Sequence, residues 1–135
     1  MANRIEWSPA AITTANTAMD GTGTVAVVFS ADEECYVSTL KFRAAGSNVA
    51  TVARLFINNG KPNAVPSNNS LWDELTLPST TASAVASTTG QSMTLGFWLP
   101  KDYRLLVTIG TSVAAGYYAT AIAWGYDPLN NTQRT

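Results

Sequence analysis

The sequence has no histidine, a single cysteine and few charged residues, and each scarcity excludes a class of function. Charged residues make up 13% of the 135 positions, about half of the roughly 25% in ordinary domains. Without an imidazole there is no Ser-His or Cys-His pair for nucleophilic catalysis. The lone Cys35 cannot build a zinc site. We expect no catalytic residue, no metal ligand and no cofactor, and we predict that the chain is not an enzyme.

The acidic and basic residues that are present do not form clusters that point to a ligand. The net charge is -1, and the eight Lys and Arg residues are scattered along the chain, so no electrostatic footprint for nucleic acid exists. Adjacent carboxylates such as Asp73 and Glu74 point to opposite faces of a strand, which does not favour an acid pair for glycoside hydrolysis.

Long hydrophobic runs are also missing. No segment approaches the length of a membrane span, and the first residues lack the apolar centre of a secretory signal. A single unpaired cysteine fits synthesis in a reducing compartment. We therefore expect synthesis in a cytoplasm, with neither a membrane nor a nucleic acid as partner.

What the sequence does contain is a series of short apolar runs separated by turn-forming residues. Several of them alternate apolar and polar residues with the period of a half-buried strand. Seven runs have strand length: Thr24–Phe29, Val37–Arg43, Thr51–Asn58, Leu71–Leu77, Met93–Leu99, Leu105–Ile109 and Tyr117–Trp124. They predict an all-β fold, a single-domain antiparallel β-sandwich of about eight strands. That number is typical of a jelly roll, with an immunoglobulin-like sandwich as the alternative.

The sandwich is expected over residues 10–126, between an N-terminal arm (1–9) and a flexible polar tail (127–135). Such an arm either docks on its own domain or reaches a neighbour. Segment Ala10–Ala18 fits a weak strand or a short helix. The Ser-, Thr- and Ala-rich stretch Ser79–Gln91 is expected to be a loop that crosses one end of the sandwich.

Two of the predicted strands allow finer expectations. In one, the alternation makes a single face the better core candidate, and its residues are Ala53, Leu55 and Ile57. In the next, Asp73 falls on the apolar face, which indicates a bulge or the start of the strand nearby.

Aromatic residues are the most suggestive functional feature. Several Trp and Tyr residues fall on the less apolar face of their strands, and exposed Trp and Tyr mark protein interfaces or sugar-stacking platforms. Each one alone also fits ordinary core packing. The interface candidates, with Ile5 from the arm included, are Ile5, Trp7, Trp72, Trp98, Tyr117, Tyr118, Trp124 and Tyr126. The low charge fits a surface covered by other subunits, or one hydrated by Ser and Thr hydroxyls.

Three stretches of the sequence carry a family resemblance. They are Gly46–Gly60 (GSNVATVARLFINNG), Glu74–Pro78 (ELTLP) and Leu99–Thr111 (LPKDYRLLVTIGT). This pattern, over roughly residues 20–126, resembles small structural proteins of tailed bacteriophages, some of which are jelly-roll cement, or decoration, proteins. The resemblance implies a protein on the outer surface of the virion head that bridges subunits of the major capsid protein. It also implies a homo-oligomer, a dimer or a trimer.

A second interpretation is a tail or fibre module that binds host-surface glycans. Its signature is an exposed aromatic platform flanked by amide side chains. Trp72 is the candidate platform, and the nearby amides are Asn58, Asn59, Asn68 and Asn69.

Overall fold

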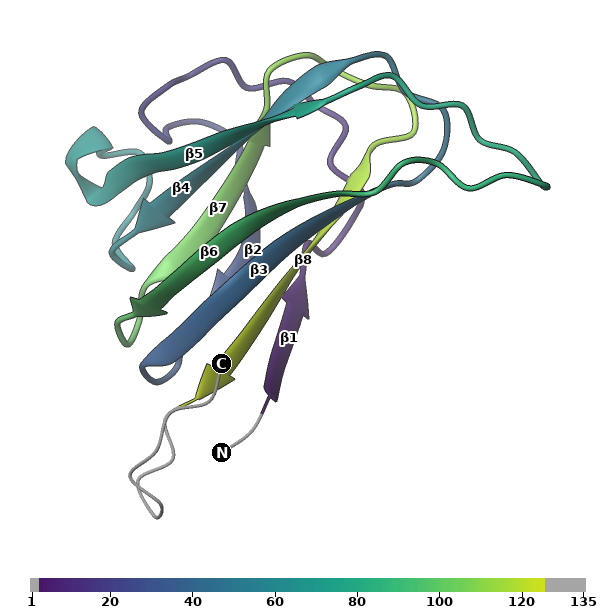
Figure 1. The fold of residues 1–135 in the computed structure, drawn as a ribbon. Coiled ribbons are helices and arrows are strands. Elements are labelled where there is room, and N and C mark those ends of the chain that lie inside the picture. The colour runs from purple at the N-terminus through teal and green to yellow at the C-terminus, as the bar shows by residue number, and fades with distance from the viewer. Residues whose placement is uncertain (1–2, 126–135) are drawn as a thin grey trace.

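The computed structural model describes residues 3–125, which form eight strands and a single 3-10 turn (Figure 1). The strands are β1 (Asn3–Trp7), β2 (Ala26–Ser30), β3 (Cys35–Ala44), β4 (Thr51–Asn58), β5 (Asn69–Leu77), β6 (Gln91–Leu99), β7 (Arg104–Ile109) and β8 (Tyr117–Gly125). The turn η1 (Pro66–Asn68) precedes β5. Within this range no helix has both the length and the apolar character needed to span a membrane.

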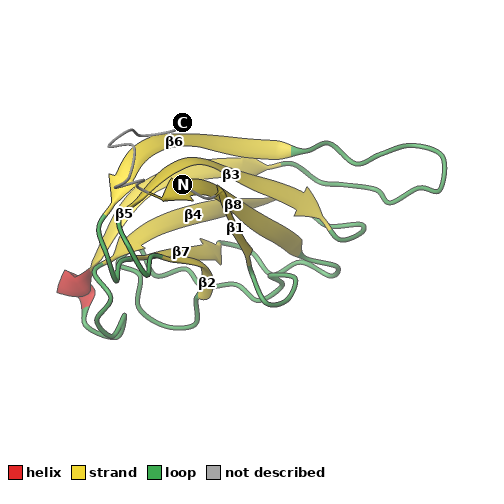
Figure 2. Cartoon of the chain, turned by 90° about the horizontal axis from the view of Figure 1, so that it is seen from below, coloured by secondary structure: helices red, strands yellow, loops and turns green. Residues whose placement is uncertain are grey.

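The strands form two antiparallel sheets of four, which Figure 2 shows as two layers. Sheet A has the order β1-β8-β3-β6, and sheet B has the order β2-β7-β4-β5. Strand 1 pairs with 8, 2 with 7, 3 with 6 and 4 with 5, as in a long hairpin folded over on itself. This is the topology of a jelly roll. An immunoglobulin-like sandwich would place its first two strands in one sheet, and here β1 and β2 lie in different sheets.

The N-terminal segment docks on its own domain, one of the two outcomes expected for an arm. Asn3–Trp7 is the edge strand of sheet A and pairs along its whole length with β8. The following segment, Ala10–Ala18, is neither the weak strand nor the short helix that the sequence suggested. It makes only isolated bridges, from Ile12 to Tyr117 and from Ala15 to Ile109. The predicted tail, 127–135, lies outside the described residues.

The core lies between the two sheets and is filled by the inward-facing residue of each alternating pair. Ala53 and Leu55 are fully buried, as the alternation predicts, and Ile57 packs at the margin of the core. Each fully buried Leu or Phe contributes about 1.5–3 kcal/mol of transfer free energy. These fully buried large side chains give the domain a single continuous core.

The outer face of sheet B is partly covered by the segment 17–24. Asn16 is hydrogen-bonded to the carbonyl of Ile109 at one side of the sheet, whereas the carbonyl of Gly21 accepts a bond from Asn63 beyond β4. The chain between them therefore crosses the outward side of β7 and β4. This crossing explains why Phe56 and Leu106, which face outward, are as buried as the core.

The bulge expected near Asp73 is present. The pairing of β4 with β5 shifts between Leu55 and Phe56, so Trp72 is left without a partner next to Asp73. The extra residue restores the alternation on both sides of it, and Leu75 and Leu77 then point toward the core.

The connection between β5 and β6, residues 78–90, passes from sheet B to sheet A. It projects beyond the end of the sandwich at which β5 ends and β6 begins (Figure 1). Its base is fixed by two backbone hydrogen bonds between Asn48 and Thr80. Arg43 donates a further bond to the hydroxyl of Thr88. Val85, near the middle of the loop, is 96% exposed, so an apolar side chain stands in solvent.

Candidate functional site

The outward side of sheet A, which we call the sheet A face, gathers most of the predicted interface residues. Strand register arranges them in rows that run across β1, β8, β3 and β6 in that order. The three complete rows are Asn3-Trp124-Tyr36-Trp98, Ile5-Ile122-Thr39-Thr94 and Trp7-Thr120-Lys41-Ser92. Tyr118 and Arg43 begin a fourth row on the two central strands.

The sheet A face carries aromatic side chains at both ends and few charges. Trp7 is 61% exposed, Ile5 55% and Tyr118 48%, whereas Tyr36 and Trp98 pack edge to face with their ring centroids 5.5 Å apart. In the described part of the chain, the outward positions of these four strands carry two cations, Lys41 and Arg43, and no carboxylate. An apolar surface of this kind is typical of a protein interface.

A bulge shapes the aromatic end of the face, which is the row Asn3-Trp124-Tyr36-Trp98. The register between β3 and β6 shifts after Val37, and Gly96 lies opposite this shift with a φ of 72°, a conformation that favours glycine. A side chain at Gly96 would begin 3.4 Å from the hydroxyl of Tyr36. Glycine therefore leaves room for the Tyr36 side chain to extend over β6.

Five of the eight predicted interface residues lie on the sheet A face, and they are Ile5, Trp7, Trp98, Tyr118 and Trp124. Tyr117 does not, because it points inward, is 2% exposed and donates a hydrogen bond to the carbonyl of Pro78. Trp72 lies on β5 and packs against Phe97 with ring centroids 4.9 Å apart. Tyr126 lies outside the described residues.

Two residues of the sheet A face, Tyr36 and Ile122, were missed by the sequence analysis. Ile122 alternates in step with Trp124 on one strand, which was the signal that could have identified it. Tyr36 precedes the predicted start of its strand at Val37. Its place on the face is evident only from the pairing of β3, which begins two residues earlier.

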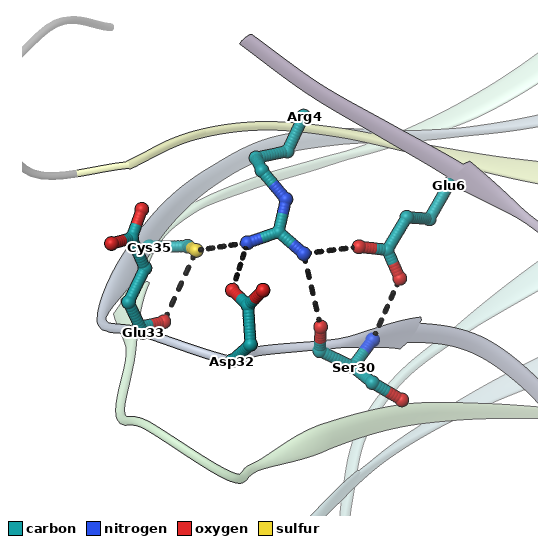
Figure 3. Close-up of polar contacts among 6 residues, drawn as sticks. All are labelled: Arg4, Glu6, Ser30, Asp32, Glu33 and Cys35. Atoms are coloured by element: carbon teal, nitrogen blue, oxygen red, sulfur yellow. Dashed lines mark hydrogen bonds and ion pairs between the residues drawn. The ribbon is translucent and has the colours of Figure 1, made fainter. Parts of the chain in front are cut away.

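A polar cluster beneath β1 fixes the edge of the sheet A face (Figure 3). The guanidinium of Arg4 donates to Asp32 and, over 2.6 Å, to the carboxylate of Glu6. Glu6 in turn accepts the backbone N–H of Ser30 on β2 at 3.0 Å. These contacts join the edge strand of sheet A to sheet B, and they hold Ile5 and Trp7 outward on the other side of β1.

The same cluster sets the ionisation of its members. Burial disfavours the charged form of Arg4, but its hydrogen bonds to Asp32 and Glu6 outweigh this effect and raise the pKa of Arg4. Burial also raises the pKa of the Cys35 thiol. That thiol donates to the carbonyl of Glu33, so it is an inert structural group rather than a nucleophile.

The asparagines considered for glycan binding are engaged in internal hydrogen bonds. Asn58 is fully buried, and its carbonyl accepts the side chain of Arg104 and the backbone N–H of Gly60. Its amide group donates to Asn69 at 2.7 Å and to the carbonyl of Lys61. The remaining pair, Asn59 and Asn68, bond to each other. These groups tie the turns at one end of sheet B together and do not form a sugar-binding platform.

Among residues 3–125, no group of three or more acidic or cysteine side chains is placed to hold a metal ion. No family model matches the chain, and no curated protein shows significant similarity to it. The strongest functional features are therefore two surfaces, the sheet A face and the projecting loop 78–90.

Proposed function

We propose that the protein is a structural component of a bacteriophage virion, a cement protein that binds the outside of the assembled head and bridges subunits of the major capsid protein. The observation that carries the proposal is the pairing of a rigid jelly roll with two exposed, nearly uncharged contact surfaces. One is a face of the sandwich and the other projects from one end of it, so each can contact a different neighbour, a capsid subunit or a second copy of the chain. The sequence resemblance to phage structural proteins supports the same function.

The physical basis of such a function is linkage. A protein that binds the assembled shell and not the separated subunits stabilises the shell by its free energy of binding. Surfaces made of apolar and hydroxyl-bearing side chains bind with little dependence on salt, because few charges take part. Among the large apolar side chains, Val85 in the loop and Trp7 on β1 are the most exposed, so both have much surface to lose on binding.

The glycan-binding alternative has less support. The amide groups that it requires are engaged in the hydrogen-bond network around Asn58. The ring of Trp72 is half covered by its packing on Phe97. Sugar recognition requires free polar groups beside an aromatic platform, because an unpaired sugar hydroxyl costs binding energy.

The test is binding of the purified chain to heads of the phage that carries its gene, assembled without this protein. We expect it to sediment with intact heads and to raise the temperature at which they rupture. A variant that lacks 83–87 should fold normally, because the bonds between Asn48 and Thr80 at the loop base remain, and should bind heads more weakly. Absence of the wild-type chain from purified virions, or no binding to heads, would contradict the proposal.

A further inference from the structure

The two outer columns of the sheet A face are complementary in size, row by row. Where β1 carries a large side chain, β6 carries a small one, and the reverse holds at the aromatic end. The three pairs, with the β1 residue first, are Asn3 and Trp98, Ile5 and Thr94, and Trp7 and Ser92. The large members on β1 are also the most exposed of the large apolar side chains on the face.

From this pattern we infer that the sheet A face binds a second copy of the chain. The two copies pack face to face about a two-fold axis that lies in the interface, parallel to the strands and between β8 and β3. That axis places β1 of one copy over β6 of the other. Trp7 then stands over the second copy's Ser92, and Ile5 over its Thr94, so a large side chain meets a small one in each row. Such an interface is self-complementary, as a two-fold contact must be.

The charges of the face agree with the same axis. Lys41 and Arg43 both lie on β3, which this axis places over β8 of the second copy. Lys41 then faces Thr120, and Arg43 faces the ring of Tyr118, a favourable contact for a guanidinium. A two-fold axis perpendicular to the strands, between the rows of Ile5 and Trp7, would instead put Trp7 over Ile5 and Ile5 over Trp7. That arrangement sets large side chains against each other and leaves the small residues of β6 uncovered.

The area of the face suits a dimer of ordinary size. With strands about 4.8 Å apart and a rise of about 3.3 Å per residue, β8, β3 and β6 over about nine residues and β1 over its five give a projected face of roughly 500 Å². With the relief of its side chains, this approaches the roughly 800 Å² per partner of a standard interface. Twisted sheets also pack readily face to face with their strands aligned.

The first experiment compares two arginine variants by sedimentation equilibrium of the full chain. Ser92→Arg puts a long side chain where the second copy's Trp7 needs a small one, whereas Thr76→Arg places the same side chain at an exposed position of β5, on the other sheet. We expect the wild type and Thr76→Arg to be dimers, and Ser92→Arg to dissociate at least about tenfold more readily. A monomeric wild type, or equal dimerisation of the two variants, would overturn the inference.

A second experiment tests the orientation of the axis. Trp7→Glu should also weaken the dimer, because it removes the most exposed ring of the face. Trp7 and Ser92 lie on opposite edge strands of one copy, so they can compensate only between copies. The double variant Trp7→Glu/Ser92→Arg should therefore recover at least part of the affinity lost in each single variant. Failure of the double variant to recover, in chains that keep the wild-type circular dichroism, would overturn the proposed axis.

This inference does not depend on binding to heads. A dimer that fails to bind phage heads would leave the inference intact and contradict the proposed function. A monomer that binds heads would overturn the inference of a dimer and leave the proposed function intact.

Discussion

At the residue scale, two buried threonines of sheet B differ in one property, the hydrogen bonding of their hydroxyls. Thr51 donates to the carbonyl of Thr111 and accepts its backbone N–H at 2.9 Å. Thr108 is 2% exposed, and within the described part of the chain its hydroxyl has no hydrogen-bond partner. Valine has nearly the same shape as threonine, so the pair isolates the contribution of the hydroxyl.

We predict that Thr108→Val raises the free energy of unfolding by about 1 kcal/mol, because it removes a buried polar group that has no protein partner. Thr51→Val should lower it by about 1–2 kcal/mol, because it leaves the amide of Thr111 unpaired. Urea denaturation of both variants checks the signs. A loss of stability in Thr108→Val as large as in Thr51→Val would contradict the prediction that the Thr108 hydroxyl contributes no stabilising hydrogen bond.

A second prediction concerns the pH dependence of the 17–24 segment. The hydroxyl of Thr22 and then its backbone N–H donate to Asp20, and together they lower the pKa of that carboxyl. The stabilisation is therefore present above the ordinary aspartate pKa of about 3.9 and is lost as the pH falls through the lower folded value. Thr22→Val should raise the pKa of Asp20 toward its ordinary value, measured by NMR titration. An unchanged titration would show that the hydroxyl contributes nothing.

Composition and alternation predicted some of the residues that face outward but not how polar groups are used. On β8, Tyr118 and Trp124 were candidates and lie on the sheet A face, whereas Tyr117, chosen with them, points inward. The same reasoning treated Asn58 as a candidate ligand-binding group. It is instead a fully buried junction between three segments, because amide partners come from distant parts of the chain and leave no local pattern.

At the scale of elements, β1 shows why a strand can look like an arm. Its apolar residues, Ile5 and Trp7, face outward, whereas Arg4 and Glu6 point toward sheet B. This reverses the usual pattern, because an edge strand at the margin of the core can satisfy inward charges with partners on the neighbouring sheet. No alternation rule could have placed this segment inside the domain.

The third prediction tests that arrangement. Arg4→Met should lower the free energy of unfolding by about 1–2 kcal/mol, because it leaves the partly buried Glu6 without its cation. Asp32→Asn should cost less than about 0.5 kcal/mol, because the Asp32 side chain is 79% exposed and its pairing is weakened by solvent. Chemical denaturation measures both. An equal loss in the two variants would show that the exposed pair carries the docking of β1.

At the scale of the whole molecule, seven of the eight strands were expected within a few residues of their actual bounds. Their alternation is imposed by a sandwich that buries one side of each sheet. The order of the strands could not be read in the same way. Several pairings that define the jelly roll join residues more than 80 positions apart, such as Cys35 with Gly125. No local periodicity encodes such a contact.

These long-range pairings predict that the domain opens as one unit, and Cys35 is the natural probe of that behaviour. It is fully buried and pairs with both β6 and β8. Its pKa is raised by burial, so forming the thiolate destabilises the folded state once the pH rises above the ordinary thiol pKa of about 8.5. At pH 8, a disulfide reagent should modify Cys35 only through global unfolding.

The free energy of opening obtained from that modification should equal the free energy of unfolding from urea denaturation. Arg4→Met should lower both by the same amount, since Arg4 also contacts the sulfur of Cys35 at 3.6 Å. If β1 instead detaches on its own, Cys35 will react faster than the chain unfolds, and Arg4→Met will accelerate the reaction more than it lowers global stability. Parallel labelling and denaturation of the two proteins distinguish a single cooperative jelly roll from one with a detachable edge strand.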